Sequence, residues 1–286
     1  MLPPLDHAAA VGRFYDEQAD AFMRVYGDVI QAFRTTDVTR LLDYEAKAME
    51  LAPGMKVLDA GCGVGAPAIY FAGRYGVRVD GVTVSAVQAK VASDKIEEVG
   101  LRGRVTVRHG DYHALGEEFE PGSYDVMCFL ESFGHSHEKS RAIESAWTML
   151  APGGRLYIKD LFIREPLIPE DQDVIDSLIR RINDSYHYEV ADLYTVLKHL
   201  RRRGFIVSAV KTVDIALEEF ENLTISYEFQ ELTGINCVDV WNGYVFPVDF
   251  FELICIKPWY DISVGNSRYF LQNLYLMQIK GVLPNT

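Results

Sequence analysis

A glycine-rich turn at residues 59–65, with the sequence DAGCGVG, constrains the fold of this chain more than any other feature. It follows the apolar run Met55–Leu58 and precedes a helical pattern over Pro67–Tyr75. Glycine tolerates the positive φ angles of a tight turn, and its missing Cβ lets backbone amides approach a ligand closely. The segment therefore predicts a strand, a ligand-binding loop and a helix in succession.

The alternation of apolar strands and helices continues beyond this turn. We expect further strands at 77–84, 105–109, 124–130 and 154–160, and further helices at 86–99 and 139–150. Strands that alternate with helices form a parallel sheet through right-handed crossovers, and ligands bind at the carboxyl ends of its strands. The sequence thus predicts an α/β fold with a doubly wound, Rossmann-like sheet.

The segments on either side of this core have a different pattern. Apolar residues recur at helical spacing before residue 50, which predicts N-terminal helices. After residue 160 the chain is rich in aromatic side chains, with a helical stretch expected at 169–200 and strands at 205–213 and 274–282. We therefore predict three parts: helices that cover the ligand site (1–50), the binding core (51–160), and a helical, aromatic cap or substrate region that also holds the last strands of the sheet (161–286).

Composition narrows the class of partner. The chain has 41 acidic and 28 basic residues, a formal net charge of −13, and such a field repels nucleic acid and anionic membranes. We expect a small-molecule substrate, no nucleic-acid partner and no membrane insertion, while the sequence leaves a homo-oligomer open. The four cysteines lie far apart, as buried thiols of a reducing compartment do, and Met1–Ala10 lacks the features of a signal peptide. A cytoplasmic localisation is expected.

The spacing of the glycines favours one kind of ligand. A dinucleotide-binding loop has the pattern G-x-G-x-x-G, whereas this turn has G-x-G-x-G with an acidic residue two positions ahead. This pattern resembles the first motif of class I S-adenosylmethionine-dependent methyltransferases. The resemblance implies that Asp59, Gly61, Gly63 and Gly65 meet the methionine end of that cofactor. The alternative is an ordinary glycine-rich turn of another doubly wound fold.

A second motif, GVTVSAVQ at residues 81–88, stands at the end of the second expected strand. It is similar to a pattern in cyclopropane fatty acid synthases and prenyl diphosphate C-methyltransferases, in which a threonine replaces the usual ribose-binding acid. The resemblance assigns Thr83, Ser85 and Gln88 to the cofactor, because hydroxyl and amide groups can bind ribose without a charge. The alternative is a serine that caps a helix beside a solvent-facing glutamine.

A third motif, HGDY at residues 109–112, resembles the adenine-binding turn of the same family. It implies that Asp111 accepts a hydrogen bond from the adenine amino group and that Tyr112 lines the ring. Each has a structural alternative, a turn residue and a core aromatic. In the N-terminal helices, Tyr15 or Tyr26 is a candidate to close on the cofactor's methionine carboxylate, although both also suit an amphipathic core.

A fourth motif, FLESFGHSH at residues 129–137, resembles the sterol, tocopherol and geranyl diphosphate methyltransferase branch. The resemblance places Leu130 at the cofactor and Glu131 at the substrate, where a carboxylate would deprotonate or stabilise a cation. His135 is a candidate general base for an oxygen or nitrogen nucleophile, whereas His137 is expected at the solvated surface. The two histidines lack a clear carboxylate partner at ligand spacing, so we predict no metal site.

These motifs lead to two ranked functions for the chain. The first is C-methylation of an isoprenoid, a prenyl diphosphate included, or of another unsaturated natural product, through a carbocation with Glu131 beside it. The second is O- or N-methylation of a small polar metabolite with His135 as base. A third alternative uses the cofactor pocket as a scaffold without methyl transfer. A nucleic-acid methyltransferase disagrees with both the charge and the fourth motif.

Overall fold

The computed structural model describes residues 4–214, 222–235 and 247–259. Its sheet has seven strands in the order β3-β2-β1-β4-β5-β7-β6. The strands are β1 (Lys56–Ala60), β2 (Arg78–Thr83), β3 (Val105–His109), β4 (Tyr124–Leu130), β5 (Leu150–Ile163), β6 (Ile206–Thr212) and β7 (Val248–Ile256). The first five are parallel, and β7 pairs antiparallel with both β5 and β6. The predicted Rossmann-like α/β fold is confirmed.

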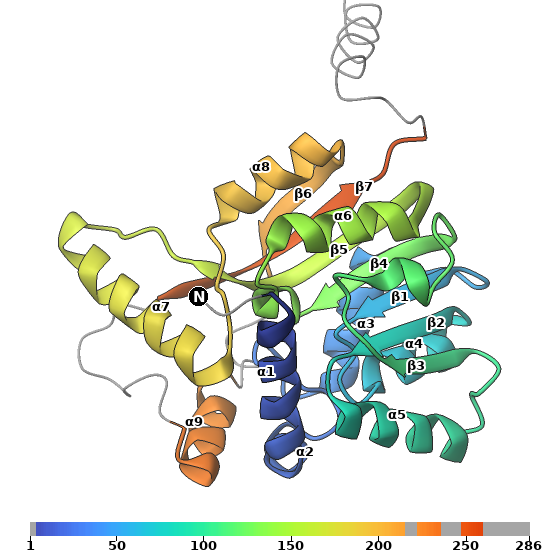
Figure 1. Ribbon diagram of the computed structural model, residues 1–286, viewed down its shortest axis with the longest axis horizontal. Coiled ribbons are helices and arrows are strands. Elements are labelled where there is room, and N and C mark those ends of the chain that lie inside the picture. The colour runs from blue at the N-terminus through green and yellow to red at the C-terminus, as the bar shows by residue number, and fades with distance from the viewer. Residues whose placement is uncertain (1–3, 215–221, 236–246, 260–286) are drawn as a thin grey trace, which may run out of the picture.

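Helices cover both faces of the sheet (Figure 1). One face packs against α3 (Val38–Ala48), α4 (Ala66–Tyr75) and α5 (Ala86–Glu98), and the other against α6 (Lys139–Met149) and α8 (Leu193–Arg203). Successive side chains of a strand point to opposite faces, so Val57 packs with the first group and Leu58 with the second. This two-sided burial explains the continuous apolar runs of the sequence.

The remaining helices gather beside the sheet rather than on its faces. These are α1 (Pro4–Glu17), α2 (Ala19–Tyr26), α7 (Gln172–Tyr186) and α9 (Asn222–Thr233), with short 3₁₀ turns η1 (Leu115–Glu117), η2 (Phe133–His135) and η3 (Pro169–Asp171). In Figure 1, α7 and α9 lie on the side of α1 that is away from α5. The Phe22 ring on α2 stacks on the Phe229 ring on α9, with centroids 4.3 Å apart. Helices from both ends of the sequence therefore share one aromatic cluster.

Three predictions about the later part of the chain have different outcomes. The strand expected at 205–213 is confirmed as β6, whereas the strand expected at 274–282 lies outside the described residues. Strand β7, which holds the buried Phe250, was not expected from the sequence. The enrichment of Val248–Ile256 in β-branched and aromatic residues was a signal for this strand. The division at residues 50 and 160 stays a prediction.

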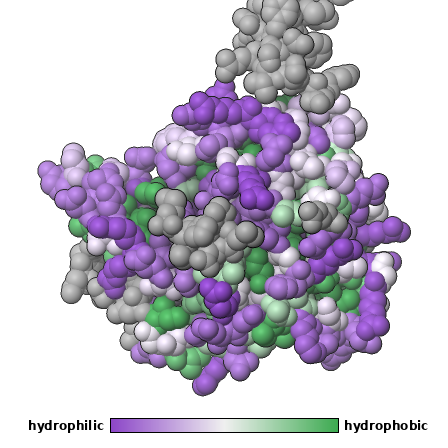
Figure 2. All heavy atoms as spheres, in the orientation of Figure 1, coloured by the Kyte–Doolittle hydropathy of each residue, from purple (hydrophilic) through white to green (hydrophobic). Residues whose placement is uncertain are grey.

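The surface agrees with the acidic composition of the chain. Figure 2 shows one face that is mostly hydrophilic, with hydrophobic residues in small, separate groups. Within the described ranges, no helix is both long and apolar enough to cross a bilayer.

Candidate functional site

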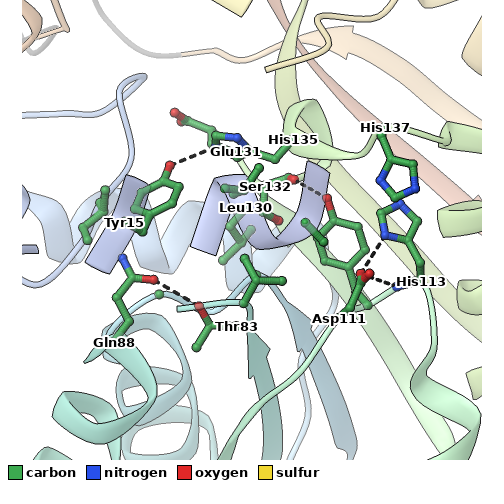
Figure 3. A pocket seen from close by; sticks show the side chains of 17 residues that line it. Tyr15, Thr83, Gln88, Asp111, His113, Leu130, Glu131, Ser132, His135 and His137 are labelled. Atoms are coloured by element: carbon green, nitrogen blue, oxygen red, sulfur yellow. Dashed lines mark hydrogen bonds and ion pairs between the residues drawn. The ribbon is translucent and has the colours of Figure 1, made fainter. Parts of the chain in front are cut away.

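Two adjoining cavities lie where β1, β2 and β4 end. The main cavity (Figure 3) has a volume of about 640 Å³ and the loop cavity one of about 310 Å³, both counted with the solvent at their open mouths. Both are lined by Ile30, Gly61, Gly63 and Leu130, so they form one continuous site. The other predicted residues that line the main cavity are Tyr15, Thr83, Gln88, Asp111, Tyr112, Glu131 and His135. Among the described residues, the predicted Gly65 and Ser85 line neither cavity.

The glycine-rich loop is shaped by close contacts that only glycine allows. Gly61 has a φ of +88°, and a Cβ there would lie 2.4 Å from the Cβ of Ser132. Gly65 has a φ of +76° and starts α4, where an added Cβ would lie 3.1 Å from that of Ala92 in α5. Gly65 thus allows close packing between two helices, and its predicted cofactor contact stays a prediction.

Asp59 lines the loop cavity and is almost completely buried. Its Oδ1 is near the Cys128 thiol, at 3.9 Å from Sγ, but its Oδ2 has no hydrogen-bond partner among the described residues. Burial, together with the nearby Glu45 carboxylate, raises the pKa of Asp59 to about 7. A buried, orphaned carboxylate oxygen fits a ligand that brings a cationic amino group, so the loop cavity suits the methionine end of the predicted cofactor.

Two residues of the second motif line the main cavity, whereas a third stabilises the start of a helix. Thr83 Oγ1 donates to Gln88 Oε1 at 3.0 Å, and both side chains are buried and line the main cavity. This pair leaves the Gln88 amide nitrogen for a ligand. Ser85 instead caps α5, accepting from the Gln88 backbone N–H and donating to Asp16 Oδ1 at 2.5 Å. In the structure this serine joins α1 to the start of α5, and its assignment to the cofactor stays a prediction.

The third motif forms a polar wall at the opposite end of the main cavity. Asp111 Oδ1 accepts hydrogen bonds from the His113 backbone N–H at 2.9 Å and from His113 Nδ1 at 2.6 Å. Burial is the largest single influence and opposes ionisation of Asp111, but the hydrogen bonds and charge of His113, together with the charge of His137, outweigh it and lower the pKa of this carboxyl group. Tyr112 Oη donates to the Ser132 carbonyl at 3.0 Å.

Sequence reasoning missed two histidines of this wall. His113 follows Asp111 by two residues and holds its carboxylate, a spacing that was a signal for it. His137, expected at the solvated surface, instead lines the main cavity, with its ring centroid 4.4 Å from that of His113. Burial lowers the pKa of His137, which favours its neutral form.

His135 and Tyr15 face each other in the wall of the main cavity (Figure 3). His135 Nδ1 lies 3.2 Å from the His187 carbonyl oxygen, which can only accept, so Nδ1 carries the proton. His135 Nε2 then accepts from Tyr15 Oη at 2.8 Å. Burial lowers the pKa of His135 to about 3, so its imidazole is neutral at physiological pH. Tyr26 lies outside both cavities, in the aromatic cluster with Phe229.

Glu131 lies at the end of β4 with its backbone at a φ of +57°, rare for a residue with a side chain. Its carboxylate accepts from the Ala32 amide at 2.6 Å, the Phe33 amide at 3.1 Å and Lys159 Nζ at 2.6 Å. In Figure 3 the carboxylate points away from Thr83 and Gln88. The hydrogen bonds of this carboxylate are thus made to the chain's own groups, and the expected role of Glu131 beside the substrate stays a prediction.

Comparisons with known proteins place this architecture in a family. A family model described as "Mycolic acid cyclopropane synthetase" matches residues 35–228, so the chain belongs to this family. Methyltransferase GfsG of Streptomyces halstedii is 30% identical over 55% of the chain and 59% of its own length. The 27-O-demethylrifamycin SV methyltransferase of Amycolatopsis mediterranei is 32% identical, over 54% of the chain and 58% of its own. The chain thus spans less than two thirds of these relatives.

Solved structures with the same fold include a cyclase and C-methyltransferases. The [4+2]-cyclase SpnF has a TM-score of 0.72 at 23% identity, covering 88% of the chain and 97% of its own. Geranyl diphosphate C-methyltransferase from Streptomyces coelicolor A3(2), in complex with S-adenosyl-L-homocysteine, has a TM-score of 0.67 at 14% identity, over 90% of the chain and 100% of its own. The predicted class I methyltransferase fold and cofactor, S-adenosylmethionine, agree with these neighbours and with the family.

Proposed function

We propose that this chain transfers a methyl group from S-adenosylmethionine to a hydroxyl group of a small natural product. The observation that carries this proposal is the Tyr15–His135 pair, a phenol hydrogen-bonded to a neutral imidazole in the wall of the main cavity. The names of relatives support it, because the Amycolatopsis enzyme acts on 27-O-demethylrifamycin SV and an Arabidopsis thaliana relative is a tocopherol O-methyltransferase. The acceptor of this chain would be of the same hydroxylated, largely apolar kind.

The two cavities provide separate contacts for the two ends of the cofactor, which when bound supplies an electrophilic methyl group. Asp59 would hold the amino group of its methionine end in the loop cavity. Gln88, oriented by Thr83, would donate to the ribose, and Asp111, oriented by His113, would accept from the adenine amino group. Tyr15 and His135 are left to face the acceptor. The protein's main tasks are then alignment and exclusion of water.

The hydrogen bonds of His135 define a route for the proton of the acceptor hydroxyl. Tyr15 Oη donates to His135 Nε2, so its oxygen can accept from that hydroxyl while its own proton moves to Nε2. The His187 carbonyl fixes the ring and stabilises the imidazolium through Nδ1. The low pKa of His135 comes from burial, which penalises an added charge. Methyl transfer removes one positive charge from the site as the imidazole gains one, so that penalty is largely offset.

C-methylation of an isoprenoid is a second candidate. It is favoured by the fold shared with geranyl diphosphate C-methyltransferases and by the rings of Tyr15 and Tyr112 in the cavity wall, since aromatic faces stabilise cations. Against it, the Glu131 carboxylate is held by Lys159 and by two backbone amides. We therefore place C-methylation second, although the sequence placed it first.

Product analysis separates the two candidates. The chain is incubated with methyl-labelled S-adenosylmethionine and, in turn, 27-O-demethylrifamycin SV, a tocopherol with a free hydroxyl group, and geranyl diphosphate. O-methylation predicts that the label appears as a methoxy group on one of the first two compounds. Label on a carbon atom of geranyl diphosphate, with none on the hydroxylated compounds, would contradict the proposal.

Cofactor binding is expected to depend on pH through Asp59. In the free protein, burial raises the pKa of Asp59 to about 7. The folded chain therefore holds this proton more tightly than the unfolded chain does, and the resulting contribution to folding stability is lost as the pH rises through about 7. A cationic group bound at Oδ2 would lower this pKa again, so binding releases a proton. Affinity for S-adenosylmethionine should rise about tenfold from pH 6 to pH 8. Calorimetry in buffers of different ionisation enthalpy measures the proton release, which Asp59→Asn should abolish; an unchanged affinity for the unmodified chain would reject the linkage.

A further inference from the structure

The segment between α2 and α3 forms part of the ligand site although it has neither helix nor strand. We name residues 29–35 the strap. Ile30 lines both cavities and Gln31 lines the loop cavity, so the strap supplies wall to the part of the site beside Asp59 and Gly61. An irregular segment has no ladder of hydrogen bonds to keep it in place. Its position must therefore come from contacts with the sheet.

Lys159 on β5 makes the first of these contacts. Its side chain is completely buried, which is rare for lysine unless the ammonium group is paired. Nζ donates to Gln31 Oε1 at 2.6 Å, to the Phe33 carbonyl at 2.9 Å and to Glu131 Oε1 at 2.6 Å. All three ammonium hydrogens are thus used, two of them on the strap.

Glu131 on the neighbouring strand end makes the second contact. Its carboxylate accepts from the backbone amides of Ala32 and Phe33, so it binds the strap through main-chain groups that do not depend on side-chain identity. Glu131 makes these contacts from a backbone conformation with a positive φ, which is rare for a residue with a side chain. The preceding residue, Leu130, lines both cavities. Leu130 therefore forms cavity wall, and the next residue, Glu131, binds the strap.

We propose that Lys159 and Glu131 are positioning residues that lock the strap against the strand ends, so that Ile30 and Gln31 complete the wall around the methionine end of the cofactor. This inference rests on the proposed function, because it takes S-adenosylmethionine as the ligand. The polar atoms of the pair are used on each other, on the strap and on Glu45, which is a positioning role. The Lys159–Glu131 pair orders this part of the wall before the cofactor binds. Preorganisation of this kind raises affinity, because the entropic cost of ordering the wall is removed from the binding step.

The burial of the pair favours a lock over a surface contact. Glu131 and Lys159 are both shielded from solvent, and a second buried carboxylate, Glu45, lies 3.5 Å from Lys159 Nζ. Loss of one partner would leave the other charge buried without compensation. The strap is irregular, whereas the strands are held by backbone hydrogen bonds. When either partner is lost, we therefore expect the strap to move away and admit water before the sheet is disturbed.

The test combines local hydrogen exchange with cofactor affinity. In Glu131→Gln, an NH₂ group replaces one acceptor oxygen, so either Lys159 or the amides of the strap lose a partner. The expected result is exchange at the amides of Ala32 and Phe33 at least tenfold faster, with a rise of tenfold or more in the Kd of S-adenosylhomocysteine. Lys159→Met should give the same two changes. If the Lys159→Met variant does not fold, the result for Glu131→Gln is the test of the proposal.

The matched control is Glu252→Gln on β7. Glu252 is also completely buried, lies opposite Lys159 in the sheet register, and accepts from Tyr157 and Lys211. It lines neither cavity among the described residues. This variant should lower the Tm yet leave strap exchange and the Kd within twofold of the unmodified chain.

The possible outcomes separate the two proposals. Wild-type strap exchange and Kd in a folded Glu131→Gln variant would overturn the lock, and so would equal changes in Glu252→Gln. If the unmodified chain does not bind S-adenosylhomocysteine at all, the proposed function fails instead. Faster strap exchange in Glu131→Gln but not in the control would then still locate the anchor of the strap.

Discussion

Replacing His135 with glutamine will lower kcat by about 10²–10⁴-fold, the usual contribution of a positioned general base, while the Kd of S-adenosylhomocysteine stays within about threefold. Glutamine keeps a polar side chain but cannot take up the proton that Tyr15 passes on. The cofactor contacts in the loop cavity are on other residues, so binding of the cofactor is spared. Single-turnover kinetics with the acceptor identified by product analysis, beside calorimetry, measure both quantities.

Tyr15→Phe tests the same route from its other end. Removal of the phenol oxygen breaks the connection between the acceptor hydroxyl and His135 Nε2, so kcat should fall by a similar factor. The control is His199→Gln in α8, which lies away from both cavities and should keep full activity. A His135→Gln variant that retains kcat within threefold would remove His135 from the mechanism.

Gly61→Ala will weaken binding of S-adenosylhomocysteine on the order of 100-fold. The added Cβ would lie 2.4 Å from the Ser132 Cβ, and alanine is strained at a φ of +88°. Backbone strain of this kind costs about 1–3 kcal/mol, and relief of the clash must shift either the loop or Ser132, both of which line the site. Calorimetric titration measures the loss, with near-ultraviolet circular dichroism to establish that the variant is folded.

Gly73→Ala in α4 is the control for this substitution. Its added Cβ meets no described atom within 4 Å, and alanine is favoured over glycine inside a helix by about 1 kcal/mol. This variant should bind as the unmodified chain does and unfold at a slightly higher temperature. A Gly61→Ala variant with unchanged affinity would show that the turn after β1 does not shape the cofactor site.

Most of the site could be predicted from the sequence because the motifs that form it are short, local patterns. Each of the motifs at residues 59–65, 81–88, 109–112 and 129–137 follows a strand, and parallel strands bring their carboxyl ends to one edge. The two residues that line neither cavity, Gly65 and Ser85, have local roles that compete with ligand binding. Gly65 packs between helices, and Ser85 caps α5. Spacing alone cannot distinguish these uses from a contact with the cofactor.

The role of Glu131 could not be predicted because its partners lie far away in the sequence. Ala32 precedes it by 99 positions and Lys159 follows it by 28. No local pattern connects the strap to the end of β4. One signal was available, since a lysine inside the apolar run of β5 must find a buried partner. That rule indicates an ion pair but not which carboxylate forms it, and several acidic residues were candidates.

The central claim is that the turn after β1 and the orphaned Asp59 carboxylate bind an amino acid sulfonium cofactor. Calorimetric titration of the unmodified chain with S-adenosylhomocysteine, and separately with a nicotinamide dinucleotide, tests it most directly. The account predicts one molecule of S-adenosylhomocysteine bound per chain and no heat from the dinucleotide. Binding of the dinucleotide with no heat from S-adenosylhomocysteine would contradict it.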